Sequence, residues 1–176
     1  MSKMSRRIVV DASVAGAAGE RSHPTSQMCR QFLLDMLTIC HKAVMSQELM
    51  IEWDNHASGY SVRWLAAMRS KRKIVTVNSG SSEGIADHFC DDTRFTPKQI
   101  GAMEKDLLLI LAALQADRLI ASCDRKVKDL FAQVALTFDD IKNIVWVDPS
   151  QEDDDCPHWL ESGARHSTSR CLGKSS

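Results

Sequence analysis

Four acidic residues of this sequence stand where their carboxylates could act together, at positions 11, 52, 106 and 124. Asp11 follows an apolar run of β-branched residues, and Asp106 precedes the apolar run from Leu107 to Leu114. Carboxylates that converge repel one another unless a cation lies among them. A ligand set made of oxygen atoms suits Mg²⁺ or Mn²⁺, whereas zinc prefers His and Cys ligands. Such a site can activate water and neutralise charge on a phosphodiester.

Two other interpretations of these residues come from elementary structure. An Asp at the end of a strand often caps the helix that follows, and for Asp11 or Asp124 taken singly this explanation is about as good as a metal site. The six histidines show no zinc-binding spacing, so we expect each to be an ordinary surface or core residue. The case for a site therefore depends on whether the carboxylates meet.

The elements that must position these residues alternate along the chain. Short apolar runs predict strands near residues 7–10, 43–45, 74–77, 119–121 and 143–147. Helical spacing of apolar residues predicts helices at 25–42, at 46–68 with a break near Gly59, from Asp106 to Leu114, and at 125–136. Ser81 or Ser82 is expected to start a short helix through Phe89. Thr96-Pro97 is typical of a helix start, and residues 97–103 form either a separate helix or part of the next one.

Strands and helices that alternate without hairpin turns predict an α/β fold with three layers, α/β/α, around a mostly parallel sheet. In such sheets ligands bind at the carboxyl edge of the strands. Asp11 and Asp124 are expected at that edge, with Asp106 at the start of a helix and Glu52 on the helix after the second strand.

Four segments resemble, in the same order, the motifs of the PIN-domain family of metal-dependent ribonucleases. Residues 9–13 are an apolar strand that ends in Asp, with Ser two places on, and residues 46–53 are a helix start with an acidic residue at 52. Residues 105–106 precede an apolar helix, and residues 119–124 are an apolar strand that closes in Ser-Cys-Asp. Each motif is short, but their common order across residues 7–149 makes the set specific. The resemblance implies a PIN-like fold and endonucleolytic cleavage of single-stranded RNA with Mg²⁺ or Mn²⁺.

The resemblance also implies roles for particular residues. Asp11, Asp106 and Asp124 would be metal ligands, and Glu52 a ligand or the residue that orients the attacking water. Ser13 and Ser122 would be hydroxyls that support those ligands. Many bacterial members of the family are toxins of toxin–antitoxin pairs, which implies an antitoxin as a partner besides the RNA substrate.

Departures from the family pattern leave some features open. Residues 72–95 are longer than the matching part of the smallest toxins, so neither the RNA target nor the partner carries over. Glu48 lies one turn before Glu52 and could exchange with it, although the spacing from Ser46 favours Glu52. A haloacid-dehalogenase-type phosphatase needs an Asp where Ser13 stands, and a phospho-receiver domain needs an acidic pair where Asp11-Ala12 stands. The alternative function is a catalytically silent RNA- or protein-binding module on the same fold.

A basic run could contact substrate phosphates: Arg69, Lys71, Arg72 and Lys73. The net charge of −1 gives no general attraction to nucleic acid, and a solvated helix end is the plainer explanation of the run. Trp53 and Trp64 share one helical face, which predicts a core position or a contact in a homodimer.

The remaining sequence features concern domain organisation. Residues 1–149 are expected to form one nuclease-like domain, and residues 150–176 a disordered tail, acidic and then rich in Ser and Arg, with 156–160 as a docking island. Six cysteines without a C-x-x-C pair predict reduced thiols and a cytoplasmic protein. No signal peptide or membrane-spanning stretch is expected.

Overall fold

The centre of the protein is a five-stranded, fully parallel sheet with strand order β3-β2-β1-β4-β5. The structure is a computed structural model and describes residues 4–81 and 84–174. The strands are β1 (Arg7–Val10), β2 (Lys42–Met45), β3 (Ile74–Thr76), β4 (Leu119–Ala121) and β5 (Val145–Val147). β1 pairs with both β2 and β4, so it lies in the middle of the sheet. The predicted parallel sheet and α/β class are confirmed.

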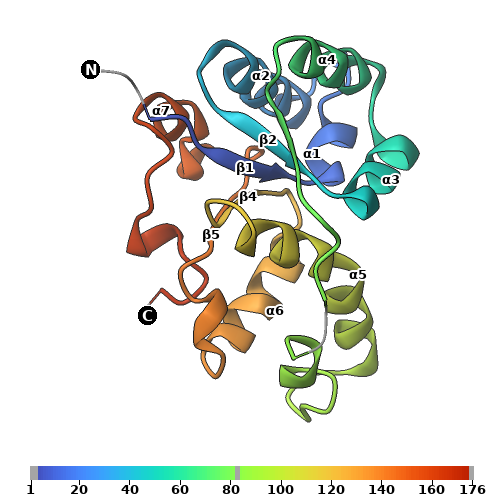
Figure 1. Ribbon diagram of the computed structural model, residues 1–176, viewed down its shortest axis with the longest axis vertical. Helices are drawn as coiled ribbons and strands as arrows, with labels where there is room; N and C mark the ends of the chain where they lie inside the picture. The colour runs from blue at the N-terminus through green and yellow to red at the C-terminus, as the bar shows by residue number, and fades with distance from the viewer. Residues whose placement is uncertain (1–3, 82–83, 175–176) are drawn as a thin grey trace.

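Helices cover both faces of the sheet, which makes the fold a three-layer α/β/α sandwich (Figure 1). One layer contains α1 (Ala12–Ala17), α2 (Pro24–Thr38), α3 (Gln47–His56) and α4 (Gly59–Ser70). The other contains α5 (Pro97–Leu114) and α6 (Arg125–Ala135). The central strands are buried because both faces are covered, which explains their almost wholly apolar sequences.

The helices of the first layer begin and end for local reasons. Ser46 caps α3 by accepting a hydrogen bond from the Leu49 amide, and Ser58 caps α4 in the same way, which confirms the predicted break near Gly59. α2 ends at Thr38, four residues earlier than predicted. Its last carbonyls accept hydrogen bonds from the Lys73 ammonium, an interaction between residues far apart in sequence.

α5 is a single helix from Pro97 to Leu114, which answers the question left open by the sequence. Thr96 and Gln99 form a reciprocal capping box that starts it. The prediction that Asp106 begins a helix was therefore wrong, because Asp106 lies in the middle of α5. The short helix expected to begin at Ser81 or Ser82 falls partly on residues 82–83, outside the described residues, and a 3₁₀ turn covers Ala86–His88.

The C-terminal segment is folded, which differs from the expectation of a disordered tail. It contains helix α7 (Cys156–Glu161), and the side chains of Trp159, Leu160 and Leu172 are buried in the core. The backbone of Cys171 bridges Val145 of β5 and covers that edge of the sheet. The segment has few apolar residues, but their spacing lets each of them pack on the domain. Its average composition, which is acidic and rich in Ser, does not indicate this spacing.

Two further features complete the core. Trp53 and Trp64 are buried and stacked, with ring centroids 5.5 Å apart. Both are therefore core residues, which is one of the two positions predicted for them. All six cysteines lie in the described part of the chain, and none is joined in a disulfide. Within residues 4–81 and 84–174, no helix has the length and apolar character needed to cross a bilayer.

The docked C-terminal segment predicts a measurable contribution to stability. Trp159→Ala is expected to lower the free energy of unfolding by about 3 kcal/mol, because it empties a buried indole site and leaves the Arg165 carbonyl without its hydrogen bond. His158→Ala, on the exposed side of the same helix, is the matched control and should change it by less than about 0.5 kcal/mol. Urea titration measures both, and equal midpoints would contradict the docking.

Candidate functional site

All four predicted carboxylates line one pocket of about 570 Å³ beside the carboxyl ends of β1 and β4. They come from four elements: Asp11 follows β1, Glu52 lies on α3, Asp106 lies on α5 and Asp124 precedes α6. The structure thus brings together residues that are separated by up to 113 positions in sequence. Ser13 also lines this pocket.

Asp11 is held by two serine hydroxyls at the junction of β1 and β4. The Ser13 hydroxyl donates to Asp11 Oδ2 at 2.5 Å, and the Ser122 hydroxyl donates to the same oxygen at 2.8 Å. The amide of Asp11 donates to the Ala121 carbonyl at 2.9 Å. Asp11 stands at the N-cap position of α1, but its side chain makes no capping hydrogen bond. The plain helix-cap explanation therefore does not apply to Asp11.

Asp124 combines both roles that the sequence suggested. Its Oδ1 accepts a hydrogen bond from the Val127 amide at 3.0 Å and so caps α6. The Asp124 amide donates to the Ser122 hydroxyl at 3.1 Å, and the Cys123 amide donates to the Ser13 hydroxyl at 3.0 Å. The two serines thus connect the turn after β4 to Asp11 and set where both carboxylates lie.

The choice between Glu52 and Glu48 is decided by the rotation of α3. Glu52 faces the pocket with Asp11, whereas Glu48 lines a neighbouring cavity with Ser46. Trp53 anchors the helix to the central strand, because its indole N–H donates to the Val10 carbonyl at 2.9 Å. This bond sets which acidic residue of α3 points to the carboxyl edge of β1.

The electrostatics of the pocket show that the carboxylates interact. The pKa of Asp106 is raised to about 7, first by its burial and then by the negative charges of Asp11 and Asp124. Glu52 adds a smaller repulsion, and the ammonium of Lys105 acts in the opposite direction. Like charges held in a partly buried pocket are costly unless a proton or a cation reduces them.

Sequence reasoning missed two side chains of this pocket, His56 and Lys105. His56 Nε2 lies 3.6 Å from Glu52 Oε2, one helical turn along α3. Lys105 is exposed and lies on the pocket wall next to Asp106. The only signal in the sequence was adjacency, because each lies one residue or one helical turn from a predicted site residue.

The basic run is placed away from this pocket. Lys71, Arg72 and Lys73 lie ahead of β3, at the amino edge of the sheet, and the pocket lining within the described residues includes none of the run. Lys73 is engaged with the α2 carbonyls, and burial lowers its pKa. Arg69 donates to the sulfur of Met50 at 3.4 Å. The structure therefore does not bring these four residues to the predicted site.

The oxygen ligands of the pocket suit a hard divalent cation, but they do not surround a closed metal site. Among residues 4–81 and 84–174, no three His, Cys, Asp or Glu side chains are already arranged to hold a metal ion. Mg²⁺ commonly binds through one or two carboxylates and keeps several water ligands, so an open, acidic pocket is compatible with it. The pKa of Asp106, raised first by burial and then by the charges of Asp11 and Asp124, is in keeping with an acidic pocket.

Comparisons with other proteins do not place the chain in a family. The chain matches no family model, no curated protein and no solved structure. The argument for function therefore depends on the site itself.

The raised pKa of Asp106 predicts how stability depends on pH. Between about pH 4 and 7 the folded protein keeps a proton on Asp106 that the unfolded chain releases, so this residue makes stability fall as pH rises. In chelator, Asp106→Asn should melt higher than the parent at pH 8 and nearly equal to it at pH 4. Because Asp106 keeps contact with solvent, we expect the melting temperature of Asp106→Asn at pH 8 to exceed that of the parent by only about 2–4 °C, which corresponds to on the order of 1 kcal/mol.

The matched control for this measurement is Asp129→Asn, the same change at an exposed position within α6. It should leave the melting temperature nearly constant at both pH values. Added salt should shrink the Asp106→Asn difference, because screening weakens the repulsion. An Asp106→Asn protein that melts lower than the parent at pH 8 would show that the carboxylates do not repel.

Proposed function

We propose that this protein is an endoribonuclease that cleaves single-stranded RNA with Mg²⁺ or Mn²⁺. The observation that carries the proposal is the meeting of Asp11, Glu52, Asp106 and Asp124 in one pocket, where burial and then the charges of Asp11 and Asp124 raise the pKa of Asp106. A pocket of this charge attracts divalent cations, and phosphodiester hydrolysis is the reaction class such sites serve. The resemblance of four motifs to PIN-domain ribonucleases supports RNA as the substrate.

The residues of the pocket would have different roles in binding the cation, the water and the substrate. Asp11, Asp106 and Asp124 would hold the cation, which when bound would neutralise charge on the phosphate and make water more acidic. Glu52 would bind it too or orient the attacking water. Lys105 is exposed on the pocket wall and is suited to bind a substrate phosphate.

The two serines would act by positioning. Each serine hydroxyl donates a hydrogen bond to Oδ2 of Asp11, which fixes the position of this oxygen and stabilises its negative charge. Residues that orient metal ligands in this way commonly affect metal affinity or activity by 10–100-fold when changed.

The first test of the function is metal dependence. We expect the parent protein to cleave a fluorescent single-stranded RNA with Mg²⁺ or Mn²⁺, to stop in EDTA, and to gain no activity from Zn²⁺. Asp11→Asn should reduce cleavage at least 100-fold, because it removes a central ligand charge, while Asp129→Asn should cleave like the parent. Cleavage that persists in EDTA, or an Asp11→Asn protein as active as its control, would refute the proposal. RNA binding with Mg²⁺ but without cleavage would instead favour a silent binding module.

The second test concerns Ser122, which links Asp11 to the turn that carries Asp124. Ser122→Ala should raise the Mn²⁺ concentration needed for half-maximal cleavage by about 10–100-fold. Ser70→Ala, at the exposed end of α4, is the control and should leave that concentration unchanged. A Ser122→Ala protein with the metal requirement of the parent would show that the serine does not position the ligands.

A further inference from the structure

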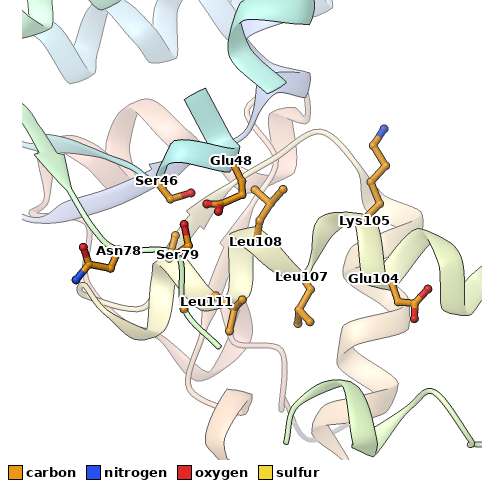
Figure 2. A pocket seen from close by; sticks show the side chains of 11 residues that line it. Ser46, Glu48, Asn78, Ser79, Glu104, Lys105, Leu107, Leu108 and Leu111 are labelled. Atoms are coloured by element: carbon orange, nitrogen blue, oxygen red, sulfur yellow. The ribbon is translucent and has the colours of Figure 1, made fainter. Parts of the chain in front are cut away.

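A second cavity, of about 320 Å³, adjoins the carboxylate pocket, and we call it the Glu48 cavity. Lys105 and Leu108 line both, so the two spaces are neighbours along α5. Figure 2 shows the cavity between the start of α3, the segment 78–80 and one face of α5. Its volume lies within the range of small-molecule pockets, and its position beside the proposed site makes it available to substrate.

The two walls of the cavity differ in character. On α5 the lining is formed by the apolar Leu107, Leu108 and Leu111, with the charged Glu104 and Lys105 one turn nearer the start of the helix. Facing them is the polar segment 78–80, which is tied to the helix because the Gln115 side-chain amide donates to the Asn78 carbonyl at 2.8 Å. At Gly80 an added Cβ would lie 3.3 Å from Leu111 Cβ, so the absence of a side chain permits this close approach.

Glu48 supplies the acceptor of the cavity. It lies in the first turn of α3, which Ser46 caps, and its carboxylate points toward the Ser79 hydroxyl (Figure 2). Hydrogen bonding to that hydroxyl lowers the pKa of Glu48, so the group stays ionised at neutral pH. An ionised carboxylate only accepts hydrogen bonds and has about four lone-pair sites. The Glu48 amide and the Ser46 hydroxyl also donate to it, so a ligand with two donors would take the free site and replace one of these donors.

The combination selects a particular ligand chemistry. An apolar wall suits the face of a planar heterocycle, and a carboxylate accepts two parallel hydrogen bonds from neighbouring N–H groups. Guanine presents such a pair, N1–H and the exocyclic amino group. Adenine and cytosine each present one amino group beside an acceptor, and uracil presents one N–H between two carbonyls. Bases of single-stranded RNA are commonly read through this edge.

We propose that the Glu48 cavity binds a guanine base of the RNA, in the nucleotide next to the bond that is cleaved, with Glu48 accepting from its N1–H and amino groups. The inference depends on the proposed function, because it places RNA in the adjoining carboxylate pocket. Glu48 precedes Glu52 by one turn of α3, which separates their Cβ atoms by about 5–6 Å. Lys105, on the wall shared by both spaces, would contact the phosphate between the two nucleotides.

The test compares guanine with inosine, whose base lacks the exocyclic amino group. Two hexanucleotides that differ only in this base are titrated against full-length protein carrying Asp106→Asn, in which cleavage is expected to be absent. The inosine RNA should bind about tenfold more weakly, because it loses one hydrogen bond to a charged acceptor. Adding Glu48→Met should bring the two RNAs to within about twofold of each other, since the acceptor is then gone.

The matched control is Glu161→Met, which removes an equal charge from an exposed side chain at the end of α7, outside the lining of the cavity. It should keep the tenfold preference. Ser79→Ala, in an exposed segment, leaves the Glu48 charge in place but releases it from its partner, and should weaken the preference. Equal binding of the guanine and inosine RNAs before Glu48 is changed, or loss of the preference through Glu161→Met, would overturn the assignment.

The same measurements separate this inference from the proposed function. If the parent protein cleaves RNA with Mg²⁺ but binding shows no preference for guanine over inosine, the guanine site is refuted and the nuclease stands. If RNA is neither bound nor cleaved, both are refuted. Melting temperatures of the variants are measured alongside to confirm that each remains folded.

Discussion

The repulsion among the carboxylates of one pocket is the constraint around which this structure is arranged. Three aspartates and a glutamate face a common space, and the pKa of Asp106 is raised there, first by burial and then by the charges of Asp11 and Asp124. Such crowding opposes folding, so other parts of the molecule must offset it. Short parallel strands, the central ones largely buried, and two helical layers supply that stability, and a divalent cation would relieve the remaining repulsion.

The junction of β1 and β4 converts this crowding into a defined geometry. The strands lie side by side, so the residues after them, Asp11 and Ser122, meet at the carboxyl edge of the sheet. Ser13 and Ser122 then fix Asp11 and the turn before Asp124 through hydrogen bonds. Side-chain positions set by backbone pairing are more rigid than positions on loops, which is what a metal or catalytic site needs.

Helix α3 gives the two neighbouring spaces their different chemistry. A serine cap at its start and the Trp53 bond to β1 fix its rotation. With that rotation, Glu52 faces the carboxylate pocket and Glu48 faces a cavity lined on α5 by three leucines. One turn of helix thus separates a carboxylate suited to hold a cation from one suited to hold a base edge.

Much of the frame was predictable from the sequence, because its signals are local. Buried strands are apolar runs, helices start at Ser46 and Thr96, and Asp11 and Asp124 follow strands that pair. Local pattern therefore predicted the parallel sheet and placed Asp11 and Asp124 at its carboxyl edge. Only the tertiary structure decided that Lys73 binds the last carbonyls of a distant helix and that the C-terminal segment docks. It also decided which glutamate of α3 faces the site. These outcomes depend on contacts between residues far apart in the chain, and no local periodicity records such contacts.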